Sequence, residues 1–432
     1  MTKIIRKRHM IFLALAVVSL WASGCASGNK KQEAENAKSA PASAMAFTPA
    51  GVPTQPPVST PTPTEMPPAT PTPAASPTST AAIAPTPSPT SPIFQTLYST
   101  DATPLAPHTV KGLSAGAEPA MAVENDVIYM AVGSQEEGVY LYDIPSEHLE
   151  MLPIHSHFPG GNFTSYEAIA KNHRLIVLDA DYQTPGEFTW AIRMIDLRTL
   201  TTKDILSVQD QVSYPGPYYD FDGERVLVQY NSHDDASQCD MSYLVFFDVT
   251  TGEAETVDAH CYENADFYWG PVYFHDNIII AEKDIPKGNE VFNDLFILHK
   301  ESGVWREEAF TNDGHSSMPV LDWPWLVWKV EKRFEWGRKN AIHNFETGET
   351  YFRTPPLIEA PSDPRRCGQF VMWGRPFLYR LPHGPLYQVP GRQGISRVHL
   401  SCNDRWVVWS EFENVEKPRG AGWAALPPTD GK

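Results

Sequence analysis

Seven short apolar runs recur along the last three quarters of the chain. Each run contains three or four consecutive hydrophobic residues and follows a turn rich in Asn, Asp or Gly. The runs are Val127–Met130, Leu175–Leu178, Val226–Val228, Ile278–Ile280, Leu326–Trp328, Phe370–Met372 and Trp406–Trp409. They start about 36 to 52 residues apart, and no long segment between them shows the 3.6-residue hydrophobic period of an amphipathic helix. The pattern predicts an all-β fold built from repeated units.

A second apolar run follows each of the first five and ends in a polar residue. These polar ends are Asp143, Asp196, Asp248, His299 and Asn344. In three repeats a glycine lies four residues later, at Gly252, Gly303 and Gly348. An Asp or Asn side chain closes such a turn while glycine supplies a positive φ, so we expect β-hairpins here. The first two repeats carry Glu147 and Leu200 instead of glycine, and we expect their turns to differ.

A repeat of about 46 residues with four strands per unit is typical of a β-propeller blade. Blades arranged around an axis bury faces that a single blade leaves exposed. We therefore predict a β-propeller over residues 94–412, with seven four-stranded blades, followed by a polar tail at 413–432. Six blades is the second possibility, and two packed β-sandwiches form the alternative architecture.

Closure of the ring requires strands from both ends of the propeller. The seventh repeat supplies only two apolar strands, Ser396–Ser401 and Trp406–Ser410. The segments Phe94–Tyr98 and Thr109–Leu113 can provide the other two. Pairing the N- and C-terminal segments in one closing blade hides sheet edges that otherwise promote aggregation.

The turns of the repeats resemble those of the TolB-like family of periplasmic propellers. The residues that carry the resemblance are Pro119, Asn125-Asp126, Pro217, Asp222-Gly223-Glu224, Pro271, Asp276-Asn277 and the Thr-Gly-Glu turns. The resemblance covers Glu118 to Glu349 and implies a propeller fold outside the cytoplasm. It carries no catalytic residues.

The first 24 residues are typical of an export signal. Basic residues precede an apolar run of about a dozen residues, which is shorter than the roughly 20 that a membrane span needs. The run ends in Ala22-Ser23-Gly24-Cys25, which resembles the bacterial lipobox except that Ala22 stands where leucine is usual. We expect cleavage before Cys25, lipidation of its thiol and anchoring to a membrane. A plain signal peptide is the alternative.

Residues 25–93 have the composition of an extended tether. Of the 40 prolines in the chain, 16 fall between Pro41 and Pro92, among Thr, Ala and Ser, and the only charged residue there is Glu65. Such a segment buries too little apolar surface to fold. Repeated Thr-Pro favours polyproline II, so the tether would hold the propeller away from the membrane.

The charge balance indicates which class of partner the chain can bind, and the cysteines indicate the compartment. The chain has 34 Lys and Arg against 52 Asp and Glu, a formal charge of −18, which argues against a nucleic-acid partner. With Cys25 assigned to lipid, four cysteines remain in an exported chain, and we expect the disulfides Cys239–Cys261 and Cys367–Cys402. The second bridge requires neighbouring innermost strands to converge. We expect no cofactor and a monomer.

The connections between predicted strands are long on one face of the propeller. Links from the second to the third strand of a blade, and from one blade to the next, share this face. We call it the long-loop face, and its connections are 154–165, 180–188, 231–242, 259–270 and 283–294. The turns of the opposite face, the short-turn face, contain two to four residues. Long loops on a rigid scaffold are where binding residues concentrate.

The long-loop face offers acids and aromatic residues. We select six as candidate ligand contacts: Tyr182, Asp234, Asp235, Tyr262, Trp269 and Trp336. Such a surface suits a sugar, a cationic peptide or Ca²⁺, or it is a solvated rim that keeps the protein soluble. His155 and His157 together with His233 resemble parts of a metal site, but a third ligand at fixed spacing is missing, so we assign no metal.

These observations predict a membrane-anchored lipoprotein whose propeller binds a protein or glycan of the cell envelope through its long-loop face. The alternative is a hydrolase or lyase that acts on an extracellular polysaccharide at the same face. Two acids within about 5 to 10 Å of each other near the channel mouth would favour this enzyme. A broad, flat aromatic patch without them would favour the binding protein. Fold alone does not decide between them.

Overall fold

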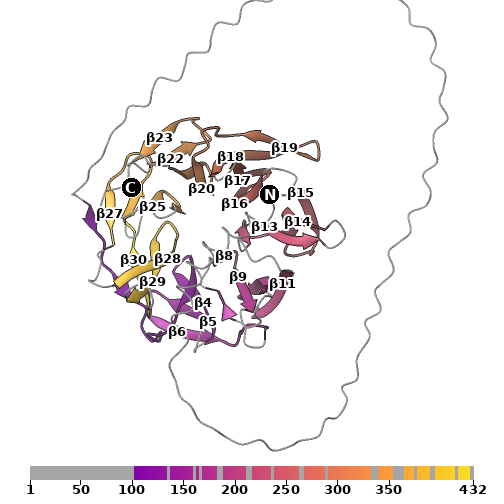
Figure 1. Ribbon diagram of the computed structural model, residues 1–432. Coiled ribbons are helices and arrows are strands. Elements are labelled where there is room, and N and C mark those ends of the chain that lie inside the picture. Colours follow the sequence, from indigo (N-terminus) through magenta and orange to yellow (C-terminus); the bar gives the residue numbers. More distant parts are fainter. Residues whose placement is uncertain are drawn as a thin grey trace, which may run out of the picture. The chain divides into compact units, whose positions relative to one another are not determined.

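The computed structural model shows a ring of β-sheets (Figure 1). The described residues are 102–428 without 134–136, 159–161, 165–167, 182–187, 211–216, 235–237, 262–266, 288–289, 332–338, 354–363, 374–376, 390–394 and 414–416. They form seven sheets, and no helix long and apolar enough to cross a membrane occurs among them.

The seven sheets are the blades, numbered here in chain order. Blade 1 contains β3 (Pro119–Glu124), β4 (Val127–Val132), β5 (Gly138–Asp143) and β6 (His148–Leu152). Blade 2 contains β7 (Asn162–Phe163), β8 (Ile169–Lys171), β9 (Arg174–Asp181), β10 (Phe188–Asp196) and β11 (Thr201–Asp210). Blade 3 contains β12 (Tyr218–Phe221), β13 (Arg225–Asp234), β14 (Cys239–Asp248) and β15 (Ala254–Cys261).

The second half of the ring repeats this order. Blade 4 contains β16 (Tyr268–His275), β17 (Ile278–Lys287), β18 (Glu290–Glu301) and β19 (Val304–Ala309). Blade 5 contains β20 (Ser316–Asp322), β21 (Trp325–Val330), β22 (Lys339–Asn344) and β23 (Thr350–Arg353). Blade 6 contains β24 (Arg365–Cys367), β25 (Phe370–Trp373), β26 (Phe377–Arg380), β27 (Leu386–Gln388) and the parallel strand β1 (Thr103–Pro104). Blade 7 contains β28 (Ile395–Cys402), β29 (Trp406–Glu413), β30 (Lys417–Ala425) and β2 (His108–Thr109). The prediction of seven blades is confirmed.

The expected turns form, with one correction. Asp248 Oδ1 accepts hydrogen bonds from the backbone N–H groups of Thr250 and Thr251, at 2.8 and 2.7 Å, and Gly252 has a φ of 79°. The expectation that the glycine-free turns differ is wrong for Leu200. Its φ is 57°, and its N–H donates to the Asp196 carbonyl just as the Gly252 N–H donates to that of Asp248. The Asp side chain therefore imposes the turn even where the residue is not glycine.

Replacing Leu200 by glycine is expected to raise the free energy of unfolding by about 1 kcal/mol, because glycine adopts a positive φ without steric cost. Leu200 is 40% exposed, so little packing is lost. Gly348→Ala is the matched opposite change: φ is 71° and nothing lies within 4 Å of an added Cβ, so stability should fall by about 1 kcal/mol. Denaturant unfolding measures both variants, and equal stability of the two variants and the parent would contradict this interpretation.

Arginines connect neighbouring blades on the short-turn face. Arg174 and Arg225, the first residues of β9 and β13, donate to backbone carbonyl groups in the turn of the next blade, those of Gly223 at 2.7 Å and Asp276 at 2.9 Å. Arg405, just before β29, bonds Asp126 of blade 1 at 2.9 Å. The same type of contact thus links successive blades and also joins the last blade to the first.

Blade 7 closes the ring with strands from both ends of the propeller, but the division differs from the expected one. The C-terminal segment supplies three strands, because β30 pairs with β29, and the N-terminal segment supplies only β2, which pairs with β30. The predicted polar tail at 413–432 is therefore wrong for Lys417–Ala425. The predicted strand Phe94–Tyr98 lies outside the described residues. The small residues of β30 form no apolar run, so the sequence pattern does not predict this strand. A Cβ on Gly422 would lie 2.6 Å from the Trp409 ring, which packs against the glycine backbone.

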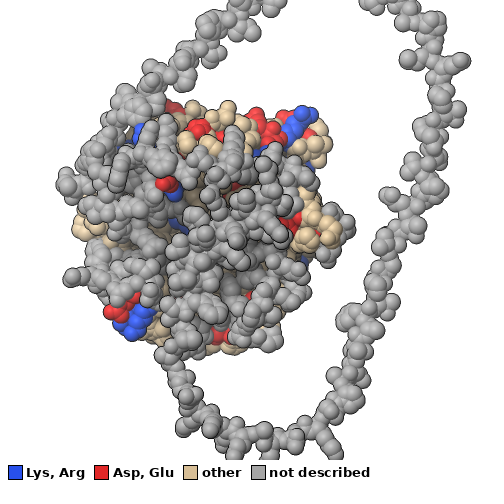
Figure 2. Space-filling model, viewed as in Figure 1, with Lys and Arg blue, Asp and Glu red and all other residues tan. Residues whose placement is uncertain are grey.

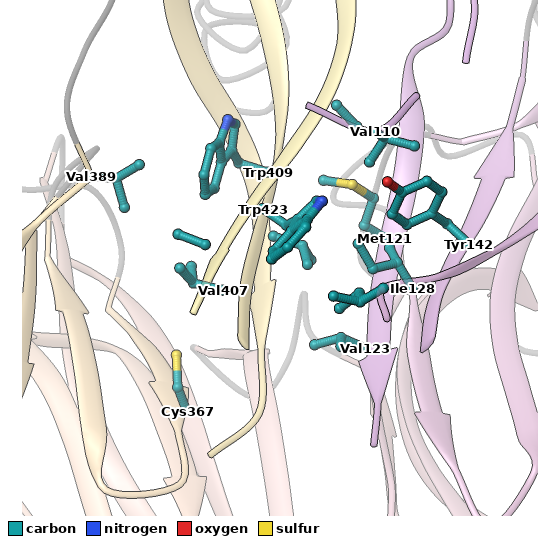
Figure 3. Close-up of a cluster of buried hydrophobic side chains, with 14 of the residues drawn as sticks. Val110, Met121, Val123, Ile128, Tyr142, Cys367, Val389, Val407, Trp409 and Trp423 are labelled. Atoms are coloured by element: carbon teal, nitrogen blue, oxygen red, sulfur yellow. The ribbon is translucent and has the colours of Figure 1, made fainter. Parts of the chain in front are cut away.

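A continuous apolar cluster fills the closure between blades 6, 7 and 1 (Figure 3). Trp409 and Trp423 of blade 7 lie between Val389, which follows blade 6, and Met121 of blade 1. Val110, just after β2, is 2% exposed and packs in the same cluster. The N-terminal segment is thus part of the core.

Both predicted disulfides are present. Cys367 and Cys402, at the ends of β24 and β28, have Cα atoms 5.1 Å apart, so the innermost strands of blades 6 and 7 do converge. Cys239 and Cys261 have Cα atoms 5.8 Å apart. The expected bulge is present, between Leu244 and Val245. The two cysteines are nevertheless not directly opposite each other, because Cys261 pairs with Met241 in the ladder.

Candidate functional site

Two hairpins extend beyond their blades on the long-loop face. The strands β13 and β14 pair from Arg225↔Asp248 to Asp234↔Cys239, whereas β12 reaches only Gln229. On the other side β15 accompanies β14 as far as Met241, so the last two pairs lie beyond both neighbouring strands. The strands β17 and β18 pair as far as Lys287↔Glu290, beyond the reach of both neighbouring strands. Two of the connections predicted as long loops are therefore mostly strand, because ladder hydrogen bonds continue through their polar residues.

A pair of carboxyl groups lies at the base of the second hairpin. Glu282 is 3% exposed and accepts hydrogen bonds from the Met318 N–H of blade 5, at 2.7 Å, and from Asn293 Nδ2, at 2.9 Å. The same Asn293 nitrogen donates to Asp284. Gly270 leaves space for the Glu282 side chain, because an added Cβ at position 270 would lie only 3.3 Å from it. The pair joins blade 4 to blade 5.

The environment of this pair favours one retained proton. Burial, followed by the charge of Asp284, raises the pKa of Glu282 well above its ordinary value. Burial also raises the pKa of Asp284. Burial and the neighbouring Asp284 raise the pKa of Tyr268 as well. We interpret Glu282 as the protonated member, which donates to Asp284, because two adjacent buried carboxylates do not both ionise readily.

We expect Glu282 to make the protein less stable at pH 8 than at pH 5. An acid with a raised pKa in the folded state keeps a proton that the unfolded chain has released, so the free energy of unfolding falls as the pH rises. Glu282→Gln removes this titration yet can still accept from Met318 and donate to Asp284.

Urea unfolding at pH 5, 6.5 and 8 measures the effect. The Glu282→Gln variant should lose less stability over this range than the parent, and the exposed control Glu308→Gln should follow the parent. Parallel curves for all three proteins would show that Glu282 is ionised in the folded state.

The position of Glu282 recurs in other blades. Gln229, Glu282, Lys329 and Ser410 are each the fifth residue of the second strand of their blade. The Ser410 hydroxyl donates to the Pro119 carbonyl of blade 1, at 3.0 Å, much as Glu282 bonds the innermost strand of blade 5. This recurring polar residue after an apolar run is a sequence signal that would have revealed Glu282, which we did not select.

The next residue, Lys283, faces the other side of blade 4. Its Nζ lies 3.8 Å from the ring centre of Phe267, 4.7 Å from that of Trp269 and 4.4 Å from that of Phe296, and it forms an ion pair with Glu307. Lys283 is 7% exposed. Cation–π contacts and the ion pair together satisfy this buried ammonium group.

The candidate contacts selected from the sequence have different positions. Trp269 is fully buried, and its indole N–H donates to Asp258 at 2.7 Å, so it is a core residue rather than an exposed contact. Burial opposes ionisation of Asp258, but hydrogen bonds from His260 and Trp269 outweigh it and hold the pKa of that carboxyl below its ordinary value. Asp234 is the last residue of β13, on the long-loop face. Four candidates lie outside the described residues, and so does the lipidation site: Tyr182, Asp235, Tyr262, Trp336 and Cys25.

The histidines considered for a metal have other partners. His157 Nδ1 lies 3.2 Å from Asp204, whereas His233 Nδ1 lies 2.7 Å from Asp240. The His155 carbonyl accepts a hydrogen bond from Arg193 at 3.0 Å. Within the described ranges, no three His, Cys, Asp or Glu side chains are grouped as a metal site would require.

Arg193 organises the connection between blades 1 and 2. It donates to the fully buried Asp179 at 3.0 Å, and Ser156 Oγ donates to the same carboxylate at 2.6 Å. Figure 2 shows that Asp and Glu side chains of the described residues, with fewer Lys and Arg, are visible around the rim of one view.

Comparison with known proteins supports the fold alone. No family model matches the chain, and no curated protein matches it. Prolyl endopeptidases are 10% identical with a TM-score of 0.50, covering 74% of this chain and 52% of theirs, so the chain spans about half their length. The β-propeller domain of the Trilobed protease from Pyrococcus furiosus is 11% identical with a TM-score of 0.49, covering 73% and 96%. An oligogalacturonate lyase in complex with manganese is 15% identical with a TM-score of 0.48, covering 76% and 98%.

Together the sheet topology and the extended hairpins define the class of the molecule. The chain contains a seven-bladed β-propeller, and two of its hairpins continue past neighbouring strands on the long-loop face.

Proposed function

We propose that this chain is an exported, lipid-anchored β-propeller protein that binds a protein or glycan of the cell envelope through its long-loop face. The observation that carries the proposal is the pair of hairpins that continue beyond neighbouring strands on that face. A two-stranded ribbon beyond its neighbours leaves backbone groups and side chains free for contact. Val291, near the tip of the second hairpin, is 51% exposed.

The turn residues support a relation to TolB-like propellers. Asp222 is an example: its Oδ1 accepts hydrogen bonds from the N–H groups of Glu224 and Arg225 at 2.8 and 2.7 Å, and the next residue, Gly223, has a φ of 107°. The Asp-Gly-Glu sequence is thus used as a structural turn. The proposed relation is therefore one of repeat architecture and gives no ligand.

The acid pair Glu282–Asp284 gives no support to the alternative of hydrolysis or elimination on a polysaccharide. Catalytic carboxyl groups of such enzymes flank a scissile bond and must be open to substrate. Glu282 is instead enclosed between blades 4 and 5 by Asn293 and Met318.

The proposed anchor rests on the sequence Ala22-Ser23-Gly24-Cys25. Cys25→Ala should abolish incorporation of labelled palmitate in a bacterial host and move the protein from the membrane fraction to the soluble exported fraction. Cys239→Ala serves as the control, because it removes a disulfide cysteine and should leave the label in place. Unchanged membrane association of Cys25→Ala would reject lipidation there.

Two exposed valines of blade 4 test the binding face. Val291 lies on the long-loop face, whereas Val304, 62% exposed, follows the turn between β18 and β19 on the short-turn face. Val291→Asp should lower capture of envelope proteins or glycans by immobilised full-length protein about tenfold, because it puts an uncompensated charge into the contact. Val304→Asp should leave capture unchanged. Equal capture by both variants would remove the assignment of this face.

A further inference from the structure

A row of three side chains runs across blade 3 from the core of the propeller to its rim. Tyr230 pairs with Tyr243 in the ladder, and Tyr243 pairs with Ala259, so the three side chains share one face of the sheet. This face is turned toward blade 2, because Tyr230 packs against the apolar cluster that contains Trp190 of that blade. The strand β15, which carries Ala259, is the outermost strand of blade 3 (Figure 1).

The Tyr243 ring is held at the edge of this core. It stacks on the Tyr230 ring, with ring centres 4.8 Å apart and ring planes 14° apart. Tyr230 in turn meets Trp190 edge to face, with ring centres 6.0 Å apart, and Trp190 is buried. Because Tyr243 lies between Tyr230 and Ala259 in the row, one face of its ring is covered by Tyr230 and the other is turned toward Ala259.

The strand β15 contributes small, exposed side chains beside this ring. Ala259 is exposed, and so is Thr256, which pairs with Val245 and therefore lies on the same face as Tyr243. Tyr243 itself is half-buried. A methyl group next to a tyrosine ring is too small to cover the ring, so the outer ring face is open to a side chain from another molecule. We call the surface formed by Tyr243, Thr256 and Ala259 the Tyr243 surface.

The charge of blade 3 selects a cation for this surface. From Val226 to Glu282 the chain contains 11 Asp and Glu residues and no Lys or Arg. Asp234 lies four residues after Tyr230 on β13, so it is on the same side of the sheet as Tyr243. Burial, followed by the negative charge of Asp234, raises the pKa of Tyr243. A neutral ring beside a carboxylate attracts a cation and disfavours an anion.

We propose that the Tyr243 surface binds a basic segment of a partner protein, with an arginine side chain lying flat on the outer face of the Tyr243 ring. A guanidinium group is planar and stacks on aromatic rings, and the small side chains of Thr256 and Ala259 leave space for its stem. The acids of blade 3 attract the other basic residues of such a segment. The surface lies at the rim of blade 3, so the inference does not rest on the lipid anchor or on the contact at Val291.

Binding of a synthetic basic peptide to the full-length protein tests the proposal. The probe is a fluorescent peptide of alternating arginine and glycine, and fluorescence anisotropy measures its Kd. The reference is the same peptide with citrulline in place of arginine, which keeps the planar shape and removes the charge. We expect the arginine peptide to bind about tenfold more tightly than the citrulline peptide, because both the ring and the acids favour the cation.

Three variants connect the binding to the Tyr243 surface. Ala259→Arg places a basic side chain of the protein itself beside the Tyr243 ring, and Tyr243→Leu removes the ring but keeps an apolar side chain. Each should weaken binding of the arginine peptide about fivefold. Ala309→Arg is the matched control, because Ala309 is also an exposed alanine on an outermost strand, β19 of blade 4, and the change in net charge is the same. It should bind the peptide as the parent does.

Three outcomes would overturn the proposal. If the parent binds the arginine and citrulline peptides equally, the surface does not recognise a cation. If Ala259→Arg and Ala309→Arg weaken binding to the same extent, the peptide responds to net charge and not to this surface. If the neutral sugar chitohexaose binds the parent more tightly than the arginine peptide and Ala259→Arg removes that binding, the ligand is a glycan. The first comparison uses only the parent protein, so it holds even if a variant fails to fold.

Discussion

Closure of the ring between blades 6, 7 and 1 is the constraint on which the rest of the structure depends. A blade buries its faces only against its two neighbours, so an open ring would expose two apolar faces at once. Three kinds of contact prevent this. The strand β2 completes blade 7, the apolar cluster around Trp409 spans the junction, and the disulfide Cys367–Cys402 joins the innermost strands. The N-terminal segment therefore contributes to the same core that the last three strands build.

Within the closed ring, the contacts between blades change from apolar to polar along the strands. Aliphatic and aromatic residues fill the middle, and polar groups such as Glu282 and Ser410 bond the innermost strand of the next blade. The strands β13–β14 and β17–β18 continue past this region with paired backbones. The elaborated face is thus an extension of the blades themselves, which makes it a more rigid surface than a set of loops.

Local pattern predicted much of the fold and little of the site. The turns at Asp248 and Asn344, the seven blades and both disulfides follow from residues close in sequence or from simple counting. The hydrophobic pattern does not predict β30, because Gly422 and its small neighbours contribute no large apolar side chains. They leave room for the Trp409 ring instead. Trp269 was selected as an exposed ring, yet Asp258 and Lys283 enclose it.

The sequence by itself determined the strand period, the polar residues that close the hairpins, and the even number of cysteines available after Cys25. Each of these depends on neighbours within a few residues, whose geometry the backbone limits to a small set. Only the tertiary structure decided which charges are buried and what meets them. Glu282 faces Met318, and Arg353 faces Tyr379, because separate blades come together around one axis. Burial changes the free energy of a charge by several kcal/mol, so this placement governs the chemistry that the chain can perform.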